Sequence, residues 1–106
     1  MLADFEHGAD AGVVSLSGRL TFAENGAFRR VVEGLQHARG DEVVLDLAGV
    51  EYIDSAGMGL LLVTRDLMAA RGGRVRLRNA AGQVARMLRL AKFGDFFVLE
   101  FDCAQV

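Results

Sequence analysis

From residue 42 onward, segments with the pattern of β-strands alternate with segments that have the pattern of helices. Glu42–Leu47 is a short apolar run, typical of a central strand that is buried on both faces. Asp54–Gly57 is expected to open a helix that continues to about Ala70. Arg74–Arg78 then alternates charged and apolar residues with the period of a strand. Strands separated by helices join through right-handed crossovers, so this alternation predicts parallel pairing.

The chain beyond residue 80 continues the same alternation. A third helix is expected, with one face made up of Val84, Met87, Leu88 and Ala91. Phe96–Phe101 is apolar and predicts a final strand.

The first twenty residues predict two strands. Leu2–His7 can pair with the following strand through the turn Gly8–Gly12. In that following strand, Val13, Leu16 and Leu20 lie among polar residues and are expected on one buried face.

A helix is expected after residue 21, because Thr21-Phe22-Ala23-Glu24 has the form of a capping box. In this motif the hydroxyl residue and the glutamate each pair with a backbone N–H at the helix start. The apolar residues that repeat at helical spacing are Phe28, Val31, Val32 and Leu35. Gly26 weakens the first turn by about 1 kcal/mol relative to alanine, and Gly40 is the expected stop.

These segments predict an α/β fold with the order β-β-α-β-α-β-α-β. The expected sheet is mixed and mostly parallel, with packed helices and with the first two strands as an antiparallel edge.

The chain has 106 residues, which suffices for one hydrophobic core and not for two, so residues 1–106 are expected to form one domain. Hydrophobic residues make up 52% and charged residues 25%, as in globular proteins. The absence of proline, repeats and low-complexity tracts leaves no linker.

Charge and hydropathy argue against several classes of function. The formal net charge of -2 argues against a dedicated nucleic-acid binder. The longest apolar run, Met58–Val63, is far shorter than the roughly 20 residues that cross a bilayer. The acidic start lacks the basic-then-apolar order of an export signal. Cys103 has no partner for an intramolecular disulfide, which fits a reducing compartment. We therefore expect a cytoplasmic protein without membrane insertion.

No arrangement of residues predicts catalysis, a cofactor or a metal site. His7 and His37 are far apart in the sequence, and neither has a companion ligand at metal-site spacing. Ser55 has no evident histidine base, so a hydrolase would lack its proton acceptor. Gly57-Met58-Gly59 matches half of a dinucleotide fingerprint, with Leu62 where the third glycine should be. The expectation is a binding protein rather than an enzyme.

The segment Val50–Gly59 is the most informative about function. Asp54 and Ser55 lie where the chain leaves a strand and enters a helix, and either residue type can cap the helix. A serine here is also well placed for phosphorylation, because a helix N-terminus tolerates the added charge whereas a docked partner need not. Gly57 and Gly59 indicate a close backbone approach, either sheet packing or a docked partner. From the residues alone, capping and switching both stay open.

Two surfaces are candidates for partner contact. Met58, at the start of the helix, is the first candidate for partial exposure, and Phe22 in the neighbouring loop is the second. The stretch from Leu67 to Gly94 contains seven basic residues and no acidic one. These basic residues either form solvated faces of a strand and a helix or form a docking surface for an acidic partner.

Several of these motifs resemble the STAS family of anti-sigma-factor antagonists. The resemblance is carried by Val44-Leu45-Asp46-Leu47, by Tyr52–Gly59 and by the closing Gly72-Gly73. Val84–Leu88 and Phe93-Gly94 also resemble the family's last helix and its exit, so the resemblance covers nearly the whole chain.

The resemblance implies a phosphorylation switch. In the family, the serine directly after the aspartate, here Ser55, is phosphorylated by a partner kinase of histidine-kinase-like ATPase fold that is also an anti-sigma factor. The unmodified protein binds this kinase and frees the sigma factor, phosphorylation releases the kinase, and a PP2C-type phosphatase resets the switch. The residues expected to contact the partner are Asp54, Ser55, Gly57 and Met58, with Phe22 and Glu24 from the neighbouring loop.

Two positions depart from the family pattern. Gly18-Arg19-Leu20-Thr21 lacks the two acidic residues that many members carry after this glycine, and this departure either changes the choice of partner or abolishes the switch. Ala56 stands where some members carry Ser or Thr, and this change leaves the switch intact. The alternative function is a non-phosphorylated STAS subunit of another assembly, such as a lipid-transport ABC complex or a chemosensory or stress-signalling complex. In that case Ser55 is only a cap.

Overall fold

A computed structural model describes residues 2–7, 12–36 and 42–101. Its strands are β1 (Leu2–His7), β2 (Gly12–Leu20), β3 (Glu42–Ile53), β4 (Arg74–Ala80) and β5 (Val98–Phe101). Its helices are α1 (Asn25–Gln36), α2 (Ser55–Ala70) and α3 (Gly82–Leu90), with the short 3-10 helices η1 (Phe22–Glu24) and η2 (Phe93–Asp95). The predicted α/β class and the order β-β-α-β-α-β-α-β are confirmed.

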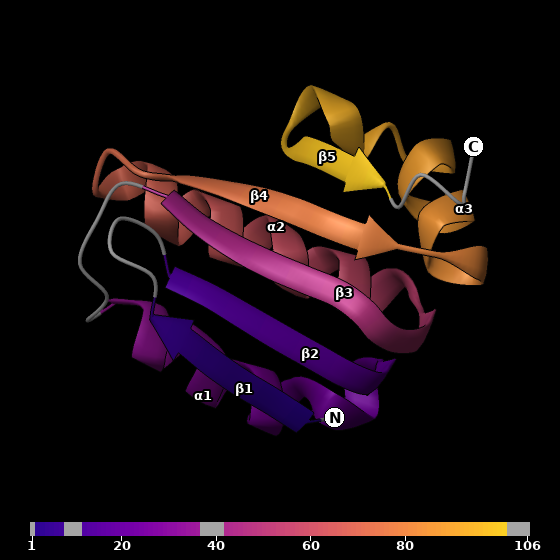
Figure 1. The fold of residues 1–106 in the computed structure, drawn as a ribbon, viewed down its shortest axis with the longest axis horizontal. Coiled ribbons are helices and arrows are strands. Elements are labelled where there is room, and N and C mark those ends of the chain that lie inside the picture. Colours follow the sequence, from indigo (N-terminus) through magenta and orange to yellow (C-terminus); the bar gives the residue numbers. More distant parts are fainter. Residues whose placement is uncertain (1, 8–11, 37–41, 102–106) are drawn as a thin grey trace.

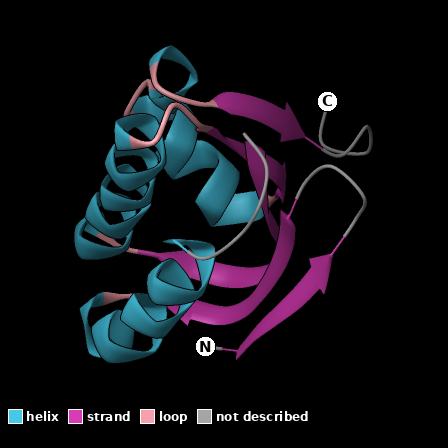
Figure 2. Ribbon diagram, turned by 90° about the vertical axis from the view of Figure 1, so that its left-hand side faces the viewer, coloured by secondary structure: helices cyan, strands magenta, loops and turns pink. Residues whose placement is uncertain are grey.

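The strands form one five-stranded sheet in the order β1-β2-β3-β4-β5 (Figure 1). β1 is antiparallel to β2, and the pairs β2–β3, β3–β4 and β4–β5 are parallel. Each of the three α-helices connects two neighbouring parallel strands, and Figure 2 shows the helices on one side of the sheet. The fold therefore has two layers, with the hydrophobic core between the helices and one face of the sheet.

β3 lies at the centre of the sheet and extends well beyond the predicted end at Leu47. Its residues Val43, Leu45 and Leu47 belong to the hydrophobic core and are at most 1% exposed. Val44, which alternates with them, is also buried, as predicted. No described helix covers its face of the sheet (Figure 2), and its neighbours on that face are charged, including Arg76, which is opposite it in β4.

Those neighbours are cross-strand ion pairs between β3 and β4. The Arg76 guanidinium lies 3.2 Å from a Glu42 carboxylate oxygen, and the Arg78 guanidinium lies 3.1 Å from an Asp46 carboxylate oxygen. Arg74 approaches Glu42 more loosely, at 3.7 Å. Arg74, Arg76 and Arg78, all in β4, therefore pair with acidic residues of β3, as expected for a polar strand face. The acidic partners precede the arginines by more than thirty residues, so the local sequence looks purely basic.

Two residues predicted to face the core do not do so. In β2, Val14 rather than Val13 shares the buried face with Leu16 and Leu20, because strand residues alternate strictly between faces. At the end of α3, Ala91 is exposed and forms the C-cap, while Ala85 is buried.

The last strand and the first helix begin later than predicted. η2 precedes β5, so β5 starts at Val98 and Phe96 lies in a turn. η1 occupies the predicted first helical turn, so α1 starts at Asn25. The predictions for residues 8–11, His37, Gly40 and Cys103 lie outside the described residues, as do those for the side chains of His7, Glu24 and Leu35. Within the described ranges, no helix has the length and apolar character that a bilayer crossing requires.

Candidate functional site

The predicted site lies at the carboxyl ends of two adjacent parallel strands. Leu20 ends β2 and pairs in register with Ile53, which ends β3. The chain then enters η1 after β2 and α2 after β3, so the starts of these two elements are neighbours (Figure 1). This edge of a parallel sheet is where α/β proteins place their binding sites.

Asp54 is the residue that holds this edge together. Its backbone is extended, and its Oδ1 accepts a 2.7 Å hydrogen bond from the Gly57 N–H, which makes it the N-cap of α2. Its Oδ2 accepts a 3.3 Å hydrogen bond from the Phe22 N–H. Its own N–H donates to the Leu20 carbonyl oxygen at 3.3 Å. One aspartate therefore joins the loop after β2 to the first turn of α2.

Ser55 is the first residue of α2 and is exposed. Its hydroxyl makes no hydrogen bond to any residue that the structure describes. The capping role that the sequence left open between two residues therefore belongs to Asp54. The Ser55 hydroxyl is not needed to complete the helix, and it stands at the positive end of the helix dipole.

Gly57 explains part of the glycine pattern at the start of α2. A Cβ atom at this position would overlap the Leu20 carbonyl oxygen and would lie 2.9 Å from Cγ1 of Ile53. The close approach predicted for Gly57 is confirmed, and the approaching group is the end of β2 rather than a partner. A Cβ at Gly59 would meet nothing within 4 Å, so packing inside the fold does not require this second glycine.

Gln83 was missed by the sequence reasoning. Its Oε1 accepts a 3.0 Å hydrogen bond from the Ile53 N–H, and its Nε2 donates a 2.8 Å hydrogen bond to the Ile53 carbonyl oxygen. The pairing of β3 with β4 ends at Asp46 and Arg78, so Ile53 has no strand partner on that side. The Gln83 amide takes the place of a strand and fixes the residue that precedes Asp54.

Replacing Gln83 with glutamate is expected to lower the free energy of unfolding by about 1–3 kcal/mol. The carboxylate can still accept from the Ile53 N–H, but it cannot donate to the Ile53 carbonyl oxygen, and two acceptors would face each other. Urea unfolding followed by circular dichroism measures the change. Arg86→Gln, at an exposed position of the same helix, is the control and should change stability by less than about 0.5 kcal/mol. Equal stabilities for the Gln83 variant and the wild type would contradict the bidentate contact.

Two exposed aromatic side chains and one cation lie at or near the ends of β2 and β3. Phe22 is 72% exposed and Tyr52 is 39% exposed. The Arg19 guanidinium lies over the Tyr52 ring, 4.9 Å from its centroid, and makes no ion pair with a described residue. Met58 is half-buried and packs against the core, in line with its predicted partial exposure. The residue that departs from the family pattern, Arg19, therefore adds a positive charge that no described acidic residue pairs with.

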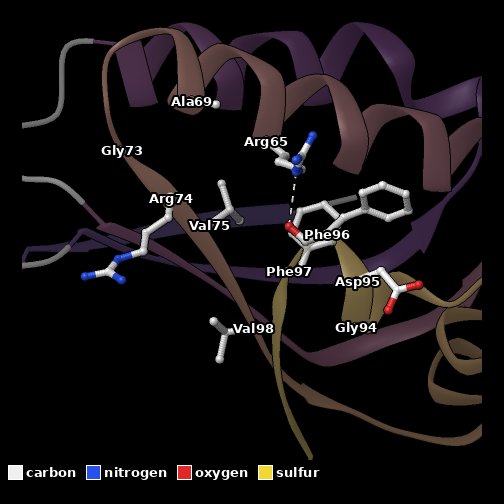
Figure 3. A pocket seen from close by; sticks show the side chains of 10 residues that line it. All are labelled: Arg65, Ala69, Gly73, Arg74, Val75, Gly94, Asp95, Phe96, Phe97 and Val98. Carbon is white, nitrogen blue, oxygen red and sulfur yellow. Dashed lines mark hydrogen bonds between the residues drawn. The ribbon is translucent and has the colours of Figure 1, made fainter.

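A separate cavity of about 350 Å³ lies toward the amino ends of β4 and β5 (Figure 3). Arg65 is part of its wall: its Nε donates to the Phe96 carbonyl oxygen at 3.1 Å, and its guanidinium stacks over the Phe96 ring. The same side chain pairs with Asp66 at 3.1 Å. In Figure 3 the charged ends of Arg74 and Asp95 point away from Arg65. The contacts of Arg65 hold the end of η2 against α2. The cavity therefore lies where these two elements pack together, and its charged side chains do not converge on a common point. Within the described ranges, no cluster of three metal-ligating side chains occurs.

Comparison with known sequences gives a family model and two relatives. Residues 3–100 match the family model whose description is "Mlab, STAS domain". A STAS-domain containing protein of Pseudomonas aeruginosa (strain UCBPP-PA14) is 27% identical over 84 residues, which cover 79% of this chain and 82% of that protein. An anti-sigma F factor antagonist of Paenibacillus polymyxa is 27% identical over 89 residues, which cover 83% of this chain and 76% of the relative.

Two solved structures share the fold. An anti-sigma factor antagonist from Mycobacterium paratuberculosis superposes with a TM-score of 0.84 at 20% identity, covering 97% of this chain and 87% of that one. A sulfate transporter family protein from Wolinella succinogenes superposes with a TM-score of 0.75 at 15% identity, covering 92% and 82% of the two chains. At these identities the likeness concerns the fold, which proteins of different function share.

Proposed function

Because the chain belongs to the STAS domain family, we propose that it is an anti-sigma-factor antagonist whose partner binding is controlled by phosphorylation of Ser55. The unmodified protein holds a kinase-type anti-sigma factor, an ATPase of histidine-kinase-like fold, and so frees a sigma factor. Phosphorylation of Ser55 by that kinase ends the complex, and a PP2C-type phosphatase restores it. This role is that of a cytoplasmic binding module, without catalysis or a cofactor of its own.

The observation that carries the proposal is that Asp54, and not Ser55, caps the helix. Asp54 caps α2 with its carboxylate and leaves the adjacent hydroxyl exposed, without a hydrogen bond to the described residues. A serine that merely completed the helix would use its hydroxyl for that purpose. The exposed hydroxyl is accessible to a kinase without any unfolding of the site.

The position of Ser55 also explains how the fold can tolerate the modification. A phosphate adds about 1.5 to 2 negative charges and three acceptor oxygens. The first N–H groups of a helix have no partner inside it, and the helix dipole is positive at this end. The bond from Asp54 to Gly57 stays in place, because it does not involve the Ser55 side chain. The charge therefore acts on the partner rather than on the fold.

The partner surface consists of the residues around this serine. Phe22 and Met58 supply apolar contact, and Gly57 lets the loop after β2 lie close against α2. Glu24 belongs to the same surface by its position in η1. Arg19 adds a cation without an ion-pair partner among the described residues, which suits a partner with an acidic residue opposite it.

The experiment is phosphate transfer to the purified protein. Wild type, Ser55→Ala and Ser17→Ala are incubated with ATP and a cell extract of the source organism, and intact masses are recorded. We expect one added phosphate on wild type and on Ser17→Ala, whose serine lies half-buried in β2, and none on Ser55→Ala. Unchanged masses for all three proteins, in an extract that contains the kinase, would contradict the proposed phosphorylation of Ser55.

The alternative is a STAS subunit of another assembly, such as a lipid-transport ABC complex or a chemosensory or stress-signalling complex. The observation that favours it is the shared fold with a sulfate transporter family protein, together with the 72% exposure of Phe22, which suits docking without modification. Affinity capture separates the two functions. Recovery of a histidine-kinase-like ATPase supports the antagonist, and recovery of a transporter ATPase supports the subunit.

A further inference from the structure

An apolar groove runs between α1 and α2 on the outer side of the helix layer. Its volume is about 520 Å³. The most exposed apolar residues in it are Val63, which is 49% exposed, and Leu67, which is 37% exposed. Val32 and Leu60 form its half-buried floor. Packing against the hydrophobic core explains why Val32 and Leu60 are apolar. It does not explain Val63 and Leu67, whose branched apolar side chains are exposed to water.

Two opposite charges stand on the α1 side of this groove. Arg29 and Glu33 both line it, and both are exposed. Neither makes an ion pair or hydrogen bond with another described residue. They are four residues apart on one helix, so they lie about 6 Å apart along its axis. The groove therefore carries a short, ordered pattern of one positive and one negative charge.

Val63 and Leu67 have the same four-residue spacing on the α2 side. A two-fold axis that crosses both helices at right angles would stack each helix antiparallel on its equivalent in a second copy. Arg29 of one copy would then face Glu33 of the other, twice, and Val63 would face Leu67, twice. A two-fold interface requires this kind of self-complementary surface.

We propose that the faces of α1 and α2 on either side of this groove pack against a second copy of the chain and form a two-fold dimer. The charge pattern favours a second copy as the partner. A partner must present an acidic residue opposite Arg29 and a basic residue opposite Glu33. The same surface presents its charges in that order when it is rotated by the two-fold axis. The contact leaves the modification site accessible, since Val63 lies about two helical turns after Ser55. The proposal concerns assembly and does not depend on phosphorylation.

The test is sedimentation velocity of the full chain over a concentration series from micromolar to millimolar. Wild type is expected to shift from monomer toward twice the monomer mass. Arg29→Glu places like charges opposite each other at two symmetric positions and should weaken the dimer by about tenfold or more. Val63→Gln removes the apolar contact and should have at least the same effect.

The charge swap Arg29→Glu with Glu33→Arg makes the experiment decisive. This double variant restores both cross-dimer pairs in reverse order and should recover the wild-type dimer affinity. Arg30→Glu, exposed on the same helix but outside the groove, is the matched control and should leave association unchanged. Circular dichroism of every variant establishes that it is folded. A wild type that stays monomeric throughout, or a swap that fails to recover the dimer, would overturn the proposal and leave the groove to another occupant.

Discussion

Replacing Gly57 with alanine is expected to lower the free energy of unfolding by about 3 kcal/mol or more. The added methyl group would overlap the Leu20 carbonyl oxygen and press on Ile53, both of which are fixed by the sheet. Overpacking against a flexible side chain can be relieved by rotation, but a backbone carbonyl can move only with its strand. Because whole domains are stable by only about 5–15 kcal/mol, this single methyl group should cost a large share of the total.

Gly59→Ala is the matched control, two residues further along the same helix. Its Cβ would meet no atom within 4 Å, so the variant should gain about 0.5–1 kcal/mol from the better helix propensity of alanine. Urea unfolding of the two variants beside the wild type measures both changes. Similar effects of the two substitutions would show that the contact with Leu20 does not govern the site.

Phosphorylated Ser55 is expected to bind the kinase-type anti-sigma factor at least about a hundredfold more weakly than the unmodified protein. A docked partner would have to bury a phosphate next to the Asp54 carboxylate, and a buried charge without a partner costs about 3–5 kcal/mol. A hundredfold change in affinity requires about 2.7 kcal/mol. The fold should persist, because the Asp54 cap is made without the serine hydroxyl.

Titration calorimetry with the isolated partner kinase, in the presence of a non-hydrolysable nucleotide, measures this difference. Ser55→Ala should bind like the unmodified wild type, because the hydroxyl has no hydrogen bond within the described fold. Thermal unfolding of the phosphorylated protein tests the second half of the expectation. Undiminished affinity of the phosphorylated form would exclude the switch. If the phosphorylated protein unfolds instead, the loss of affinity comes from damage to the fold and not from repulsion of the partner.

The arrangement of elements could be predicted from the sequence because it depends on local periodicity. The helical spacing of Phe28, Val31 and Val32 and the alternation in Arg74–Arg78 each lie within one segment. Alternating strands and helices then leave few topologies, so the parallel sheet followed. The predictions that were wrong, at Val13 and Ala91, concern which of two adjacent residues faces the core. That choice depends on the register with which a segment meets its neighbours.

The start of α2 shows where local pattern is insufficient. Asp54 and Ser55 are both good capping residues, and nothing between residues 50 and 59 ranks them. In the structure the Asp54 carboxylate accepts from the Gly57 N–H, and the Phe22 N–H, thirty-two residues away, donates to its second oxygen. Gly57 and Gly59 likewise look equivalent in the sequence, and only the path of β2 past Gly57 separates them.

Gln83 and the strand arginines follow the same rule. The Gln83 amide acts on Ile53 across thirty residues, and Glu42 and Asp46 pair with arginines that follow them by more than thirty. The sequence by itself determined the class of fold, the order of its elements and the segment that carries the candidate site. Tertiary structure alone decided which residue caps, which glycine is required and which charges are paired, because each depends on contacts between segments that only the sheet register brings together.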